Sequence, residues 1–256
     1  MTQATHPAIC PAPTPARKCA PAIPDGIKAL ILDFDGTLAD TADSHEQALR
    51  AALHPYDVGL DHNWYRHHVG LSIHDLLNAL PGGRPLPHDE IIRTSRTHLL
   101  ATMHSIKPIP CVVALLSAAR HAGLPCAVAS GASGHLVHPG IDALRLTHEF
   151  AAAVAREDVA HGKPAPDLFL TAARRLGVPP EGCLAVDDAP DGVTAARAAG
   201  MHVITVVDGH LAPADEGAPA ARSFPGVLAP APSSTAVTPD DAVPDITAPR
   251  SADSAR

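Results

Sequence analysis

Several features are rare or missing in this 256-residue sequence, and each absence narrows the class of protein. Aromatic residues make up only 3% of the chain although 46% of its residues are hydrophobic, so its core has to be built from alanine, leucine and valine. No run of about 18 consecutive apolar residues occurs, so no transmembrane segment is predicted. The formal net charge of −8 argues against non-specific nucleic-acid binding, which needs a basic surface.

Cysteines are also few, and they form neither a CxxC pair nor a metal-binding spacing. They are Cys10, Cys19, Cys111, Cys126 and Cys183. An odd and scattered set fits reduced thiols in a cytoplasmic protein better than it fits a disulfide framework. We therefore expect a cytoplasmic protein that binds neither membranes nor nucleic acids. We expect it to be a monomer, with a dimer as the alternative.

Both ends of the chain lack apolar periodicity. Residues 1–25 are rich in proline, alanine and threonine and hold no apolar stretch of the signal-peptide type, so we predict a disordered leader. Residues 209–256 have a similar proline- and alanine-rich composition, so we predict a disordered tail. Neither end buries enough apolar surface to offset the entropic cost of ordering it. The predicted folded part is therefore about 26–208.

The residues that suggest chemistry begin with a pair of acids. A short apolar run over 27–32 predicts a buried strand, and Asp33 and Asp35 follow it, just before Gly36. Alternation along a strand would place the two carboxylates on opposite faces, but the glycine permits a turn that brings both to one site. Two close carboxylates need a cation or a proton between them, and Mg²⁺ prefers such oxygens. Considered alone, the pair is explained equally well by turn and helix-cap preferences.

A helical segment follows the first strand. Apolar spacing predicts helices over 42–53, 72–80, with Ser72 as N-cap, and about 88–103. Residues 42–106 thus form a small helical domain inserted into the rest of the chain.

Three later segments also place polar residues after apolar strands. A strand over 125–130 ends in Ser130-Gly131, one over 182–186 ends in Asp187-Asp188, and one over 150–155 precedes Lys163. Lys163 stands in a loop, because a residue before proline is disfavoured in a helix. Helices are predicted over 111–122, 164–176 and 190–199, and a last strand over 201–207. Alternating strands and helices predict a parallel, doubly wound α/β sheet, with its ligands beyond the carboxyl ends of the strands.

These four segments resemble the motifs of the haloacid dehalogenase-like hydrolases. DFDGTLADT at 33–41 is similar to the first motif, DxDGTLxDS/T, and Ser130 stands where the second motif has a serine or threonine. KPAPDLF at 163–169 is close to KPxPDxF, and DDAPDG at 187–192 matches the acidic fourth motif. The resemblance covers about 27–207. It implies a Rossmann-like α/β core at 26–41 and 107–208, with an inserted α-helical cap at 42–106.

The resemblance also implies catalytic roles. Asp33 would be the nucleophile that becomes an aspartyl-phosphate, and Asp35 the general acid and base. Lys163 would neutralise the charge of the nucleophile and of the transferring phosphoryl group. Ser130 and Gly131, together with Lys163, would bind phosphate.

The cofactor implied by the resemblance is Mg²⁺. Its ligands would be the carboxylates of Asp33 and Asp188 and the backbone carbonyl of Asp35. Asp187 would either bind the metal as well or support the residues that bind it. His45, four residues after the first motif, is a weaker candidate for a functional role.

The implied activity is that of a Mg²⁺-dependent phosphoric monoester hydrolase acting on a small phosphorylated metabolite, for which we predict a sugar phosphate. The cap has no lysine between 42 and 106, so it lacks the Schiff-base residue of the phosphonate hydrolases of this superfamily. Ile73 stands where the β-phosphoglucomutase branch has a substrate-binding arginine, which disfavours a mutase without excluding it. Haloacid dehalogenases lack an acid at the position of Asp35, so the presence of this residue disfavours a dehalogenase. A non-catalytic sensor of phosphorylated metabolites is a distant alternative.

Overall fold

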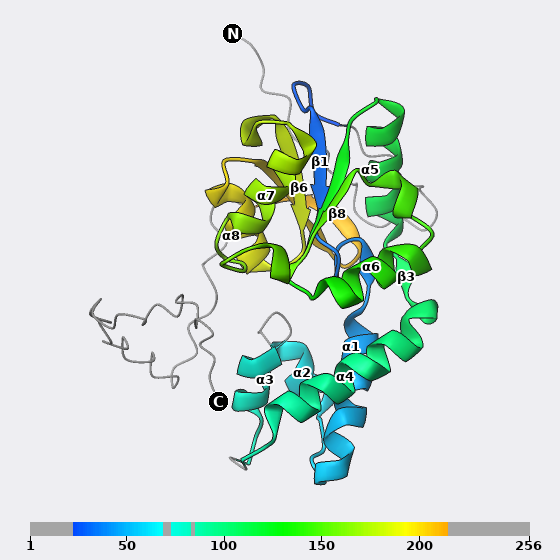
Figure 1. The fold of residues 1–256 in the computed structure, drawn as a ribbon, viewed down its shortest axis with the longest axis vertical. Helices are drawn as coiled ribbons and strands as arrows, with labels where there is room; N and C mark the ends of the chain where they lie inside the picture. Colours follow the sequence, from blue (N-terminus) through cyan, green and yellow to red (C-terminus); the bar gives the residue numbers. More distant parts are fainter. Residues whose placement is uncertain (1–22, 69–72, 83–84, 215–256) are drawn as a thin grey trace, which may run out of the picture. The chain divides into compact units, whose positions relative to one another are not determined.

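The core of the protein is a six-stranded sheet in the order β5-β4-β1-β6-β7-β8 (Figure 1). A computed structural model describes residues 23–68, 73–82 and 85–214. The first five strands in this order are parallel, and β8 runs antiparallel to β7. Their bounds are β1 Ala29–Leu32, β4 Cys126–Ala129, β5 Ala152–Val154, β6 Cys183–Asp187, β7 His202–Val207 and β8 His210–Pro213. The predicted parallel α/β sheet is confirmed.

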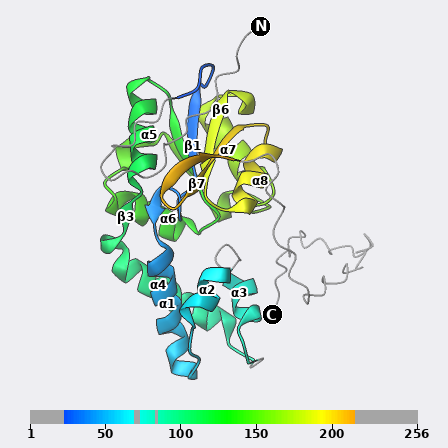
Figure 2. The same cartoon turned by 180° about the vertical axis from the view of Figure 1, so that it is seen from behind.

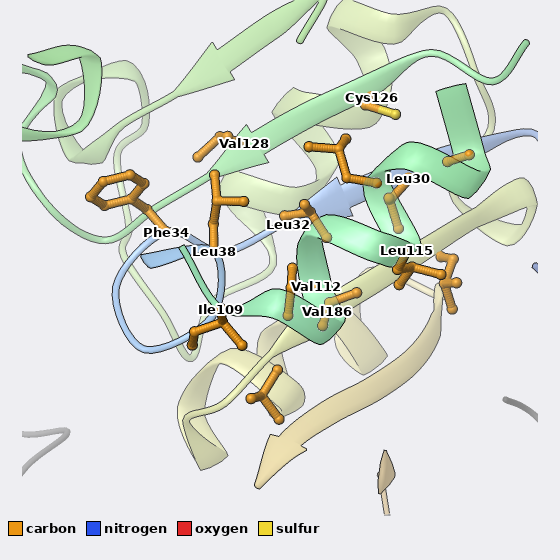
Figure 3. Packing of buried hydrophobic residues seen from close by; sticks show 14 of the residues in the cluster. Leu30, Leu32, Phe34, Leu38, Ile109, Val112, Leu115, Cys126, Val128 and Val186 are labelled. Carbon is orange, nitrogen blue, oxygen red and sulfur yellow. The ribbon is translucent and has the colours of Figure 1, made fainter. Parts of the chain in front are cut away.

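Helices cover both faces of this sheet, as Figures 1 and 2 show from opposite sides. On one face, α5 (Pro110–His121) and α6 (Gly134–Ala143) pack against side chains that include Leu30 and Leu32 of β1 (Figure 3). On the other, α7 (Asp167–Leu176) and α8 (Pro190–Ala198) pack against a cluster that includes Ala29 and Ile31. Successive residues of a strand point to opposite faces, so an uninterrupted apolar strand serves both layers.

The segment between β1 and α5 is helical and has an apolar cluster of its own. Its helices are α1 Ala42–Leu53, α2 His62–His68, α3 Ile73–Ala79 and α4 His88–Thr102. Leu49 and Leu53 of α1 pack there with Tyr65, Leu77 and Ile91. Two short strands, β2 (Ala39–Asp40) and β3 (Lys107–Pro108), pair where the chain leaves and re-enters the core. The predicted helical insertion is confirmed, while its exact bounds at 42 and 106 stay a prediction. None of the helices in the described ranges has the length and hydropathy to span a bilayer.

The predicted end of the core at 208 is too early. A turn at Asp208 and Gly209, both with positive φ, reverses the chain, and β8 then pairs with β7 and buries Leu211. Four residues of strand carry too little alternation to be recognised in the sequence. Residues 1–22 and 215–256, which hold most of the two predicted tails, lie outside the described residues, as does Ser72.

Three further expectations need correction. Helix α7 begins at Asp167 rather than at residue 164, after the two prolines of the Lys163 loop, and β5 has three residues instead of six. Helix α6 was not predicted, because Pro139 lies inside it. Cys126 and Cys183 are free, but Cys111 is disulfide-bonded, so the expectation of reduced thiols is wrong for Cys111.

The contact between Phe34 and Gly140 couples α6 to the segment that carries Asp33 and Asp35. Phe34 is buried, and a Cβ atom on Gly140 would overlap its ring. We expect Gly140→Ala to destabilise the protein by about 1–3 kcal/mol, because an overpacked core has to shift. Gly134→Ala in the same helix is the matched control, since a Cβ there makes only ordinary contacts at 3.5 Å. Equal denaturation midpoints for the two variants would contradict this prediction.

Candidate active site

The acidic residues of two motifs meet because their strands are neighbours. β1 pairs with β6 in parallel, with Leu32 beside Val186. The backbone amide of Asp33 donates to the carbonyl of Val186 at 2.9 Å, so the chain stays in register one residue beyond β1. Asp187 is the last residue of β6, and Asp188 follows it. The carboxyl ends of two parallel strands therefore bring these three acids to one edge of the sheet.

Lys163 joins two of these acids. Its Nζ donates to Oδ1 of Asp33 at 2.5 Å and to Oδ2 of Asp187 at 2.6 Å. The lysine side chain is only 12% exposed, and Nζ lies 5.3 Å from the ring centroid of Phe169. Burial alone would lower the pKa of Lys163, but the two carboxylates outweigh burial and raise it. The lysine therefore stays charged in the site.

One lysine does not balance three carboxylates. Burial raises the pKa of Asp33 well above its ordinary value despite the opposing charge of Lys163, and Asp187 and Asp188 raise it further. Burial and the charge of Asp187 raise the pKa of Asp188 to about 6. Each of these three acids offers a carboxylate oxygen, and these oxygens lie within 4.8 Å of one another. Their chemistry fits a hard divalent cation, which would relieve the repulsion.

Close backbone approaches shape this acidic cluster. Gly36 has φ +76°, and a Cβ atom there would overlap the carboxylate of Asp188. A Cβ atom on Gly192, in the first turn of α8, would overlap the carboxylate of Asp187. Both glycines belong to the motif patterns, but the sequence does not reveal which side chain needs the space.

Thr37 is a site residue that the sequence analysis missed. It is fully buried, and its hydroxyl donates to Oδ1 of Asp188 at 3.0 Å while it accepts from the Asp188 amide at 3.0 Å. The threonine thereby holds both the side chain and the backbone of Asp188. The only signal in the sequence was its place after the glycine of the first motif.

Asp35 and His45 form a separate pair. His45 Nε2 lies 2.9 Å from Oδ1 of Asp35, and the Asp35 carboxylate is not part of the three-acid cluster found among the described residues. Burial by itself would raise the pKa of Asp35, but the charge and hydrogen bond of His45 lower it. Burial would lower the pKa of His45, but Asp35 outweighs it and raises that pKa. The weaker candidate His45 is thus in contact with a predicted catalytic acid.

Ser130 and Gly131 lie at the end of β4, the other neighbour of β1. Ser130 is buried; its amide donates to the Val154 carbonyl at 2.9 Å, and its Oγ accepts from the Ala132 amide at 3.1 Å. Gly131 is exposed. These contacts hold the start of the loop in a bend at the same edge of the sheet as Asp33.

Comparison with known proteins identifies the family of this chain. Residues 27–200 match the sequence model of the haloacid dehalogenase-like hydrolases. The chain belongs to this family. Among its relatives, the fructose-1-phosphate phosphatase YqaB of Escherichia coli is 34% identical over 191 residues, which cover 69% of this chain and 95% of that protein. The β-phosphoglucomutase of Bacillus subtilis is 28% identical over 193 residues, covering 72% of this chain and 84% of the mutase.

A solved structure has the same fold. CbbY from Rhodobacter sphaeroides, in complex with phosphate, matches with a TM-score of 0.62 and 31% identity, covering 70% of this chain and 85% of CbbY. The predicted family and fold class are confirmed, and the predicted enzyme class agrees with a phosphatase among the relatives. The roles predicted for individual residues stay predictions.

Removing the hydroxyl of Thr37 tests how Asp188 is held. We expect Thr37→Val to destabilise the protein by about 1–3 kcal/mol, because it removes the partner of both the half-buried carboxylate and the backbone amide of Asp188. We also expect weaker binding of Mg²⁺ in a calorimetric titration. Thr37→Ser keeps the hydroxyl and is the control. Equal Mg²⁺ affinities for the valine and serine variants would contradict a role for this hydrogen bond in metal binding.

The pair of Asp35 and His45 predicts a pH-dependent stability. Because the pKa of His45 is raised in the folded state, its ion pair contributes full stability at a pH below about 6.5, the pKa of histidine in the unfolded chain. This contribution is lost as the pH rises through the higher pKa of the folded state. The lowered pKa of Asp35 contributes full stability at a pH above about 3.9, the pKa of aspartate in the unfolded chain. That contribution is lost as the pH falls through the lower pKa of the folded state. The excess melting temperature of the wild type over His45→Gln should therefore be larger at about pH 5.5 than at about pH 9. A constant difference would contradict this assignment.

Proposed function

We propose that this protein is a Mg²⁺-dependent phosphatase that hydrolyses a small sugar phosphate through an aspartyl-phosphate on Asp33. One observation carries the proposal: Lys163 bridges the buried carboxylates of Asp33 and Asp187 beside Asp188. A nucleophilic carboxylate paired with a lysine inside an acidic cluster suits attack on phosphorus. The lysine and a cation in the cluster would balance the charge of a phosphate that enters the site.

Asp33 is the nucleophile in this proposal. Lys163 binds Oδ1 of Asp33, which leaves Oδ2 to attack phosphorus. The bond between Oδ2 and phosphorus forms as the bond between phosphorus and the ester oxygen breaks. Lys163 keeps the carboxylate oriented and offsets charge on the transferring group, which is the kind of electrostatic stabilisation that contributes most in such sites.

Asp35 moves the protons. It donates a proton to the departing ester oxygen and later takes one from the water that attacks the aspartyl-phosphate and releases phosphate. His45, at 2.9 Å, fixes the orientation of the Asp35 carboxylate. Because the pKa of His45 is raised and that of Asp35 is lowered, His45 holds the proton of the pair, and Asp35 takes this proton from His45 to deliver it to the ester oxygen.

The metal and phosphate subsites follow from the remaining residues. The carboxylates of Asp33, Asp187 and Asp188 would hold Mg²⁺, with the backbone carbonyl of Asp35 as a further ligand. A bound Mg²⁺ neutralises negative charge on the phosphoryl oxygens. Ser130 would bind the phosphate through its hydroxyl, and Gly131 would bind it through its backbone amide.

A sugar-phosphate mutase is the alternative, because it would use the same core residues, and one relative is a β-phosphoglucomutase. Ile73 favours hydrolysis. It opens α3 and packs against the apolar cluster of the helical insertion, so this position supplies core packing rather than a cation for a second phosphate. For the substrate we infer a sugar or polyol phosphate, and fructose-1-phosphate is the first compound to test. The cytoplasmic location and monomeric state stay predictions.

Phosphate release from a panel of sugar and polyol phosphates tests the proposal. We expect turnover that needs Mg²⁺ and disappears with EDTA. Asp33→Asn should lower kcat by at least about 1,000-fold, as removal of a nucleophile does, and Asp35→Asn by about 100–10,000-fold. Asp40→Asn, an exposed acid of the same motif, is the matched control and should keep wild-type turnover.

Three results would overturn the proposal. Unchanged turnover in Asp33→Asn would exclude this residue as the nucleophile. Isomerisation of β-glucose-1-phosphate in the presence of a bisphosphate activator, without net phosphate release, would identify a mutase instead. A protein that binds phosphate esters but turns none of them over would be a sensor.

A further inference from the structure

A short turn after β5 stands between the two loops that carry the proposed phosphate-binding residues. This 3-10 turn, η4, spans Arg156–Asp158. The first loop, 130–134, follows β4 and begins with Ser130. The second, 159–163, follows η4 and ends with Lys163. The first two residues of η4 make hydrogen bonds to both loops.

Arg156 and Glu157 hold the loop that begins with Ser130. The backbone amide of Arg156 donates to the carbonyl of Ala132 at 3.0 Å. Oε2 of Glu157 accepts from the amide of Gly134 at 2.9 Å. Hydrogen bonds from the Ser133 side chain and from this Gly134 amide lower the pKa of Glu157, so the acid stays ionised and a good acceptor.

Arg156 also holds the loop that ends with Lys163. Its Nη1 donates to the carbonyl of Val159 at 2.9 Å, and its Nη2 donates to the carbonyl of Ala160 at 3.3 Å. The side chain lies so close to Gly162 that a Cβ atom there would be 3.3 Å from Nε. One guanidinium, with donors in a fixed planar arrangement, thus spans most of the loop before Lys163.

The turn itself has a firm base. Oδ2 of Asp158 accepts from the Ala155 amide at 2.8 Å, and Oδ1 pairs with Nη2 of Arg175 at 2.7 Å. Arg175 lies on α7 and also donates through Nη1 to the carbonyl of Ala153 in β5 at 2.7 Å. The turn is therefore anchored to a core helix and to the sheet, and its hydrogen bonds to the two loops can restrict their movement.

We propose that Arg156 and Glu157 are positioning residues that hold the Lys163 loop and the Ser130 loop in one fixed relation. The inference rests on the proposed function, because it assumes that both loops contact the phosphoryl group. Neither side chain needs to touch substrate. Arg156 acts through the placement of Lys163, and Glu157 acts through the placement of the residues after Ser130.

The two residues predict different kinetic effects. We expect Arg156→Ala to lower kcat by about 10-fold or more with a smaller change in KM, because Lys163 acts on the transferring group and a misplacement of 1 Å can cost about 100-fold. We expect Glu157→Ala chiefly to raise KM, since the Ser130 loop binds phosphate. Glu157→Gln keeps an oxygen that can accept from Gly134 and should restore most of the loss.

A matched control is available on the surface. Arg120 and Glu149 form an ion pair at 3.4 Å in which both side chains are about 40% exposed. Arg120→Ala and Glu149→Ala should leave kcat and KM unchanged. A general effect of losing a surface charge would instead appear in these two variants as well.

Amide hydrogen exchange supplies a readout that needs no substrate. We expect faster exchange in 159–163 for Arg156→Ala and in 131–135 for Glu157→Ala, with wild-type exchange in both control variants. Unchanged exchange in these loops would overturn the inference, as would faster exchange with wild-type kcat and KM. If the wild-type protein hydrolyses no phosphate ester, the proposed function fails, and with it the positioning role; the exchange data then still decide whether Arg156 and Glu157 order the loops.

Discussion

The site depends on an imbalance of charge at one edge of the sheet. Three carboxylates gather where β1 and β6 end, and a single buried lysine pairs with two of them. Repulsion among these carboxylates costs free energy unless further positive charge enters, so the site favours the binding of a divalent cation. The phosphate of a substrate, itself negative, would enter only when lysine and cation together outweigh the acids. In the proposed function, the binding of a metal ion and the binding of substrate would both follow from this one electrostatic constraint.

The fold accommodates the acidic cluster by burying the strands that carry it and by packing backbone closely against the carboxylates. Because β1 is apolar on both faces, helices pack on either side and leave its carboxyl end as the place for polar residues. Gly36 and Gly192 bring backbone against the carboxylates of Asp188 and Asp187, and the buried hydroxyl of Thr37 donates a hydrogen bond to Asp188. Side chains at these glycines would push the acids apart, so backbone and charge are matched to each other.

The helical insertion is linked to the chemistry through its first turn. Helix α1 begins directly after the first motif and places His45 against Asp35. The insertion has its own apolar cluster. In the proposed reaction, this arrangement allows one helix to set the environment of the acid that handles protons.

Local patterns in the sequence determined the class of fold, the bounds of α1 and the four segments from which the site is built, because periodicity, prolines and motif spacing depend on neighbours along the chain. They did not reveal β8, whose four residues are ordered by pairing with β7, or α6, which contains Pro139. Nor could they show that Lys163 lies between Asp33 and Asp187, that Thr37 holds Asp188, or that Arg156 contacts two loops. Those contacts join residues from different parts of the fold, and only tertiary packing decides which side chains meet.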